Sequence, residues 1–215
     1  MTGSIRLCLL AAGAFALAAC TGNVSLAPAS GEQGVATNAS LPQAQQQWWQ
    51  RLQALCGNAY VGTLIRAPQG DNTFRDSRVV MHVRDCSDER VRIPLAIGDN
   101  LSRTWVFTRE NGRILFRHDH RHEDGSPEPM TDYGGYTSNA GSADTQMFPA
   151  DDITADAIPG SGQRSVWLVE IHPDERFVYA ANRVGTERGF QVDFDLANPV
   201  EAPPAPWGWQ DANEG

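Results

Sequence analysis

Lysine is absent from this sequence of 215 residues, so all 17 basic residues other than histidine are arginines, against 26 aspartates and glutamates. The formal net charge of −9 argues against nucleic-acid binding, which needs a basic surface. It argues equally against adhesion to anionic lipid through a polybasic segment. The exclusive use of arginine is consistent with the base composition of the genome, or with ion pairing, because arginine forms forked pairs with carboxylates.

The short motifs of common catalytic sites are also missing. The sequence contains no G-x-S-x-G turn, no H-E-x-x-H helix, no glycine-rich phosphate loop and no C-x-x-C pair. No segment supplies a nucleophile, a base and an oxyanion site together. We therefore expect a binding or structural protein rather than an enzyme, with metal-assisted hydrolysis as the alternative.

No apolar run reaches the roughly 20 residues that a helix needs to span a bilayer. The run over residues 7–19 follows Arg6 and ends in small residues, which is the pattern of a secretory signal. It closes on Leu17-Ala18-Ala19-Cys20, which resembles the lipobox of bacterial lipoproteins. The resemblance implies acylation of Cys20 and a lipid anchor in the bacterial cell envelope. By the same resemblance, to enteric lipoproteins, Thr21 in place of an aspartate implies the outer membrane, with the protein facing the periplasm.

Cysteine is scarce, with four in the chain. Cys8 lies in the signal segment and Cys20 at the lipidation position, which leaves Cys56 and Cys86. Two cysteines in an exported domain predict one disulfide. It would close a loop of about 30 residues and contribute roughly 3–4 kcal/mol through the entropy of the unfolded chain.

The composition divides the chain into a signal peptide (1–19), a flexible tether (20–41), one β-rich domain (42–208) and a disordered acidic tail (209–215). The tether is small and polar without periodicity. Residues 42–57 carry apolar side chains at helical spacing, so they predict a helix. Pro42 suits its first turn and Gly57 its end.

After this helix the apolar period changes to two, as in strands with one buried face. Turn signals such as Asn111-Gly112 separate the runs. We expect strands over residues 59–66, 78–86, 90–95, 103–109, 113–122, 130–136, 145–148, 166–171, 176–182 and 190–196. This pattern predicts a mostly β fold, an antiparallel meander closing into a barrel-like (calycin-like) or sandwich domain with one N-terminal helix. Trp207 and Trp209 are expected to fold back as a plug on the barrel, or else to bind a partner.

Five segments resemble a group of uncharacterised secreted or lipid-anchored bacterial proteins. They are CSDERVRIP, SRTWVFTR, HDHRHEDG, TDYGG and VDFDLANPV. The resemblance implies an intact fold and an envelope location, and it transfers no catalytic role. The implied partners are a membrane, through the N-terminal lipid, and an unidentified small molecule or protein.

The segment RHDHRHEDG, residues 117–125, holds three of the five histidines. His118, His120 and His122 occupy alternate positions and continue the phase of Ile114 and Phe116. They should therefore share the core-facing side of one strand. At least one imidazole should be buried and hydrogen-bonded, because an unpaired buried polar group costs about 1–3 kcal/mol.

One role for this segment is a metal site, with Zn as the suitable ion. His118 and His120 are about 7 Å apart along a strand, so their rings can converge on one ion. A third ligand has to come from a neighbouring strand, and Asp132 is the candidate. Asp132 and Tyr133 are expected on the partner strand, reached through a turn at Asp124-Gly125.

Two other roles remain open. The histidines can line a polar pocket for an organic ligand or a protein, with aromatic walls from Trp105, Tyr133 and Tyr136. They can instead form a structural hydrogen-bond network where the barrel core meets solvent. The sequence does not decide between metal, pocket and network.

Overall fold

A computed structural model of the protein describes residues 39–68 and 74–209. The predicted signal peptide, Cys20, most of the tether and residues 210–215 lie outside the described residues. Within the described ranges, no helix has the length and apolar character needed to cross a membrane.

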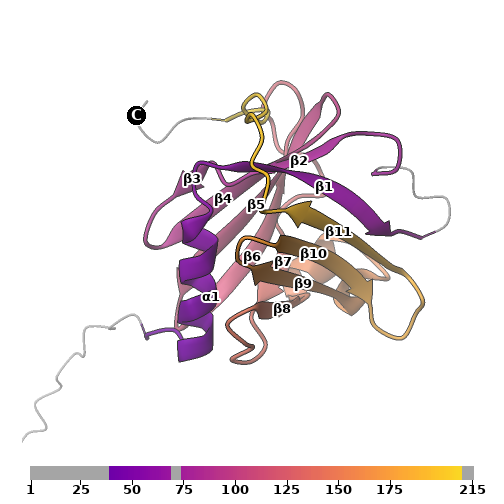
Figure 1. Ribbon diagram of the computed structural model, residues 1–215. Coiled ribbons are helices and arrows are strands. Elements are labelled where there is room, and N and C mark those ends of the chain that lie inside the picture. Colours follow the sequence, from indigo (N-terminus) through magenta and orange to yellow (C-terminus); the bar gives the residue numbers. More distant parts are fainter. Residues whose placement is uncertain (1–38, 69–73, 210–215) are drawn as a thin grey trace, which may run out of the picture. The chain divides into compact units, whose positions relative to one another are not determined.

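The described strands form one antiparallel sheet in the order β7-β6-β5-β4-β2-β1-β11-β10-β9-β8, with β3 paired to β4 beside this path (Figure 1). Their bounds are β1 Ala59–Arg66, β2 Val79–His82, β3 Asp85–Cys86, β4 Arg90–Ile97, β5 Asn100–Glu110, β6 Arg113–His120, β7 Tyr133–Tyr136, β8 Thr145–Pro149, β9 Ser165–His172, β10 Arg176–Arg183 and β11 Gly189–Asp195. Almost every pair of neighbours consists of strands that follow each other in the chain. Among the described strands there are two exceptions: β2 pairs with β4, past the short β3, and β1 pairs with β11, where Gly62 lies opposite Phe194.

The two ends of the sheet, β7 and β8, come together and nearly close a barrel. Ser138 N–H donates to the carbonyl of Met147 at 3.3 Å, and Asp151 N–H donates to the carbonyl of Gly134 at 3.1 Å. The predicted mostly β, barrel-like fold is confirmed, and the curled sheet replaces the alternative of two separate sandwich layers.

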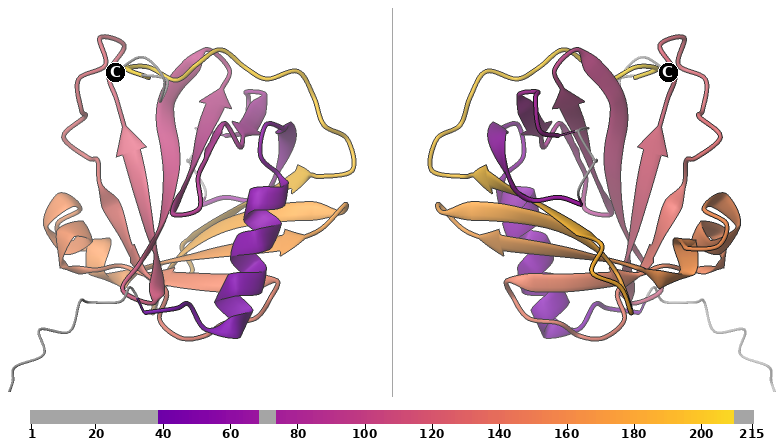
Figure 2. Two further views of the ribbon diagram at one scale, coloured as in Figure 1. Left: turned by 90° about the vertical axis from the view of Figure 1, so that its left-hand side faces the viewer. Right: turned by 90° about the vertical axis from the view of Figure 1, so that its right-hand side faces the viewer.

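The predicted helix is confirmed as α1, Gln43–Ala54, which begins directly after Pro42. It lies across one end of the barrel (Figure 2). Trp48 is fully buried, and its ring centroid lies 5.6 Å from that of Phe107 and 6.1 Å from that of Phe148. Burying a large apolar side chain stabilises the fold by about 1.5–3 kcal/mol. The buried side chains of α1 therefore hold the helix against one end of the core.

The disulfide between Cys56 and Cys86 is present, with a Cα–Cα distance of 6.3 Å. It joins the turn after α1 to β3. The chain turns away from the helix at Gly57, whose φ of 84° suits a residue without a side chain. The helix is thus fixed to the sheet covalently as well as by its tryptophans.

One predicted strand needs correction, and two short helical elements were not predicted. The strand expected over 78–86 is divided into β2 and β3, because the step from Met81 to Asp85 faces the shorter step from Leu95 to Arg92 on β4. The additional residue is accommodated as a bulge. A second helix, α2 (Asp152–Ala157), and a 3-10 turn, Gly162–Arg164, were not predicted, because elements this short show no apolar period.

The C-terminal tail does not plug the barrel. Trp207 N–H donates to the carbonyl of Leu101 at 3.2 Å, and the Trp209 ring centroid lies 3.9 Å from the Arg92 guanidinium carbon. Arg92 alternates with the buried Val91 and therefore points outward from β4. The tail packs on the outer surface of the sheet through a cation–π contact.

Candidate functional site

At the barrel end away from α1, the inner strand faces enclose a cavity of about 520 Å³. We call it the barrel-end pocket. Its aromatic and histidine walls are Phe74, Trp105, His118, His120, Tyr133, Trp167, Tyr179 and Phe190. Three arginines also line it: Arg103, Arg183 and Arg188.

His118 is held from both ring nitrogens and is only 2% exposed. Its Nδ1 lies 3.0 Å from the carbonyl oxygen of Tyr133, and its Nε2 lies 2.7 Å from the Tyr179 hydroxyl. A carbonyl only accepts, so Nδ1–H donates and Nε2 accepts from Tyr179 O–H. Burial lowers the pKa of His118 to about 3, which keeps the imidazole in this neutral form.

His120 stands nearer the opening and is 9% exposed. Its Nε2 lies 3.2 Å from the Tyr133 hydroxyl, and its Nδ1 lies 3.8 Å from a Glu128 carboxylate oxygen. Burial, and then the positive charge of Arg103, lower the pKa of His120 to about 4. Burial raises the pKa of Tyr133 to about 12, so the phenol remains a hydrogen-bond donor.

These positions confirm that His118 and His120 share the inner face of β6. The expectation for His122 was wrong, because this residue is exposed. β6 ends at His120, and the chain then turns so that Arg121 forms a β-bridge with Pro127. The expected turn is present, since Gly125 N–H donates to the carbonyl of His122 at 2.9 Å.

The proposed metal ligands are not brought together. Asp132 is exposed, precedes β7 with a φ of 55°, and meets β6 through its backbone N–H, which donates to the His118 carbonyl at 2.8 Å. Among the described residues, no group of three His, Cys, Asp or Glu is placed to hold a metal ion. His118, moreover, would have to give up a buried hydrogen bond to bind one.

Of the predicted aromatic walls, Trp105 and Tyr133 line the pocket and Tyr136 does not. Tyr136 pairs with Leu115, which alternates outward on β6, and Tyr136 therefore points outward too. Its hydroxyl donates to Glu110, and the Arg113 guanidinium lies 4.2 Å from its ring centroid.

The rest of the pocket comes from strands that the sequence analysis did not connect with the histidines. Tyr179, Ala181 and Arg183 alternate along β10 and face inward together, opposite Trp167 on β9. Arg183 continues the series of side chains on β10 that face into the barrel. An arginine in such a series is a sequence signal that could have indicated a cavity there. The pairing of distant strands could not be read from that signal.

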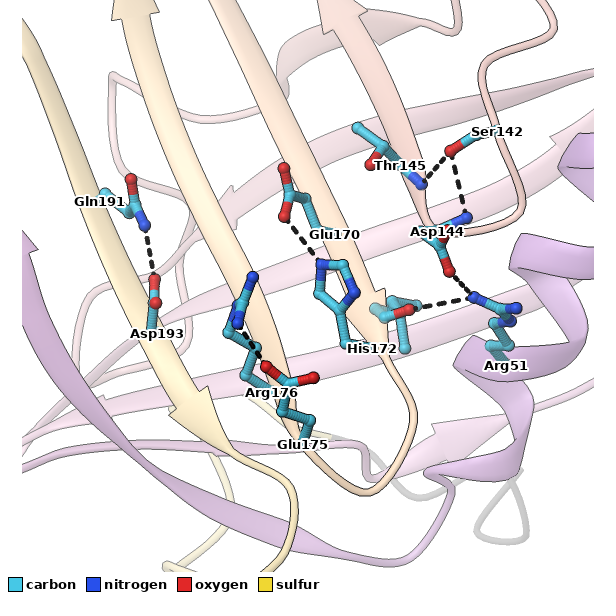
Figure 3. Close-up of polar contacts among 11 residues, drawn as sticks. Arg51, Ser142, Asp144, Thr145, Glu170, His172, Glu175, Arg176, Gln191 and Asp193 are labelled. Atoms are coloured by element: carbon cyan, nitrogen blue, oxygen red, sulfur yellow. Dashed lines mark hydrogen bonds and ion pairs between the residues drawn. The ribbon is translucent and has the colours of Figure 1, made fainter.

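The outer face of β9 to β11 carries a different polar cluster (Figure 3). The His172 Nε2 lies 3.0 Å from Glu170, and Arg176 pairs with Glu175 at 2.5 Å. Arg51 of α1 pairs with Asp144. Arg51 and Arg176 each have a carboxylate partner here, as on an ordinary solvated surface.

Comparison with known proteins adds no relative to this description. No protein-family model matches the chain, and neither a curated protein nor a solved structure matches it. The barrel-end pocket is the feature of the fold from which a function can be inferred.

Proposed function

We propose that this chain is a lipid-anchored protein of the bacterial cell envelope whose barrel binds a small organic molecule in the barrel-end pocket. The observation that supports binding is the pocket itself. Aromatic walls and a defined set of polar side chains, among them two histidines and three arginines, surround one cavity at the open end of a barrel. Small-molecule sites in proteins share this composition, and closed barrels commonly hold one ligand at their mouths.

The hydrogen bonding of the histidines favours binding over catalysis. His118 is neutral and satisfied by Tyr133 and Tyr179, so it is not poised to transfer a proton at neutral pH. The network fixes the ring positions of the pocket wall. If the network were purely structural, side chains would fill this end of the barrel. Instead, a cavity of about 520 Å³ lies beside the network.

Ala181→Trp is expected to block the pocket. Ala181 lines the cavity from the inner face of β10, and an indole there would occupy the space of a ligand. The neutral fluorophore N-phenyl-1-naphthylamine, whose emission rises in apolar sites, should bind the wild-type domain. The variant should bind it about tenfold or more weakly, which corresponds to about 1.4 kcal/mol.

Thr63→Trp is the matched control, because Thr63 is exposed on β1 and lies opposite Asp193, on the outer face. This variant should bind the fluorophore as the wild type does. Equal binding by all three proteins, or no binding by the wild type, would reject the pocket as the site.

The anchor is tested separately at Cys20. Cys20→Ala removes the thiol that the lipobox resemblance assigns to acylation, so the precursor should remain unprocessed and lack acyl chains. Mass spectrometry of the protein from membrane and soluble fractions measures both. Unchanged processing and membrane partitioning in the variant would refute lipidation, and would leave the binding proposal standing.

A further inference from the structure

We propose that the ligand of the barrel-end pocket is an organic anion with a flat ring body, its negative group held by the arginines at the opening. This inference rests on the proposed function and specifies its ligand class. It comes from the charge of the pocket lining, the partners of each arginine and the chemistry of the walls.

The pocket has the opposite charge to the chain. The sequence carries a formal net charge of −9, with 26 acidic residues. The pocket lining nevertheless includes Arg103, Arg183 and Arg188 and contains no aspartate or glutamate. A carboxylate oxygen of Glu128 lies 3.8 Å from the His120 imidazole, outside the pocket lining. A cationic cavity in an acidic protein concentrates anions and disfavours cations.

Arg103 lines the opening of the pocket without a counter-charge. It lies opposite His120 on β5, two positions from the inward-facing Trp105. Its guanidinium donates to Asn100 at 2.9 Å and to the Ser102 hydroxyl at 3.1 Å, both neutral acceptors. In the described part of the chain, no carboxylate forms an ion pair with it.

Arg183 and Arg188 provide the second half of the cationic rim. Arg183 ends the inward series of β10 and donates to the Ser161 hydroxyl. Its backbone N–H donates to the carbonyl of Arg188 at 3.0 Å, which keeps the two residues together. Neither forms an ion pair with a carboxylate within the described ranges. By contrast, Arg117 and Arg176 pair with acids at 2.5 Å.

Guanidinium groups without carboxylate partners retain their capacity for forked hydrogen bonds with a ligand. A ligand carboxylate supplies the missing partner. Below the rim, the walls are aromatic faces, with Trp105 and Tyr179 centroids 4.3 Å apart and Trp167 5.8 Å from Tyr133. Faces of this kind pack well against a planar ring system. The pocket thus suits an anionic group at its opening and a ring within.

Three probes with one ring body and different charges test the inference: naphthalene-2-carboxylate, naphthalene-2-carboxamide and naphthalen-2-ylmethylammonium. Titration by calorimetry at pH 7.5 should give the tightest binding for the carboxylate, weaker binding for the amide and the weakest for the ammonium. Arg103→Gln and Arg183→Gln should each weaken the carboxylate about tenfold, as expected for a lost charged hydrogen bond. Both should leave the amide within about twofold.

Arg176→Gln is the matched control, since Arg176 lies at the other end of β10 and pairs with Glu175 outside the pocket. It should change none of the three affinities. If the glutamine variants unfold, wild-type protein at low and high salt still decides, because screening should weaken the carboxylate alone.

Amide or ammonium binding as tight as that of the carboxylate overturns the inference. So does a wild type that binds N-phenyl-1-naphthylamine and none of the three probes. If that fluorophore also fails to bind, the proposed function itself is rejected, so the two failures are distinguishable.

Discussion

Gly135→Ala is expected to prevent the barrel from closing. A Cβ at Gly135 would lie 1.8 Å from the carbonyl oxygen of Pro149 and 2.9 Å from its carbonyl carbon, both backbone atoms of β8. Backbone cannot rotate aside as a side chain can, so β7 and β8 would have to separate. We expect a loss of roughly 4 kcal/mol or more, as for the most disruptive core substitutions.

The surroundings of Gly135 leave no easy route for relaxation. Its neighbour Gly134 is held by Thr154 of α2, which accepts from the Gly134 N–H and donates to the Gly134 carbonyl, both at 2.7 Å. A Cβ at Gly134 would lie 1.9 Å from the carbonyl oxygen of Phe116. The pair of glycines therefore fits between β6 and β8, and neither position has space for a methyl group.

Urea unfolding followed by tryptophan fluorescence measures the effect. Gly160→Ala is the control, because Gly160 has a φ of 78° and no atom within 4 Å of an added Cβ. It should cost about 1–2 kcal/mol for the left-handed backbone alone. A Gly135→Ala protein as stable as Gly160→Ala would show that β7 and β8 do not approach as described.

The domain is expected to lose stability in mild acid because the imidazoles of His118 and His120 are buried; His82 is buried as well, and burial lowers its pKa in the same direction. The pKa values of His118 and His120 are about 3 and about 4 in the folded protein, chiefly through burial. In the unfolded chain they return to about 6.5. Between these values the unfolded state binds more protons, so the free energy of unfolding falls as pH decreases.

Each histidine should remove about 1.4 kcal/mol for every pH unit below 6.5, so the pair should remove roughly 5 kcal/mol by pH 4.5. The loss ends near pH 4 for His120 and near pH 3 for His118, where the folded protein also binds the proton. Urea unfolding from pH 7.5 to 4.5 measures this slope. His118→Gln should be less stable at pH 7.5 but flatter with pH, because one titrating group is gone.

His122→Gln provides the comparison, because His122 is exposed beyond the end of β6. It should keep the wild-type slope. A His118→Gln protein with that same slope would show that His118 does not stay neutral inside the barrel.

Much of the strand pattern was predictable from the sequence because alternation depends on local burial. The series Ile114, Phe116, His118 and His120 indicated one inner face, and these residues are buried together. The end of that series was not predictable. His122 continues the same alternation, but β6 ends at His120, before His122. Where a strand ends depends on its partner strand, so the sequence of β6 alone does not show it.

One part of the candidate site was predictable from the sequence, because local patterns connect strands that follow each other in the chain. Trp105, His118 and Tyr133 lie on adjacent strands of one meander, so short-range reasoning brought them together. Tyr179 and Arg183 reach them across the barrel from the second half of the chain. Their approach depends on how the sheet curls, which no local pattern specifies.

The pairing of β1 with β11 has a consequence for how the chain assembles. All other neighbouring strands of the described sheet are close in sequence, so the loops between them are short and the strands can pair quickly. The β1–β11 seam joins segments from opposite ends of the domain and should form late. Until it forms, both strands expose unpaired edges, and each edge matches the complementary edge of another copy. The route to a strand-exchanged dimer therefore runs through this seam.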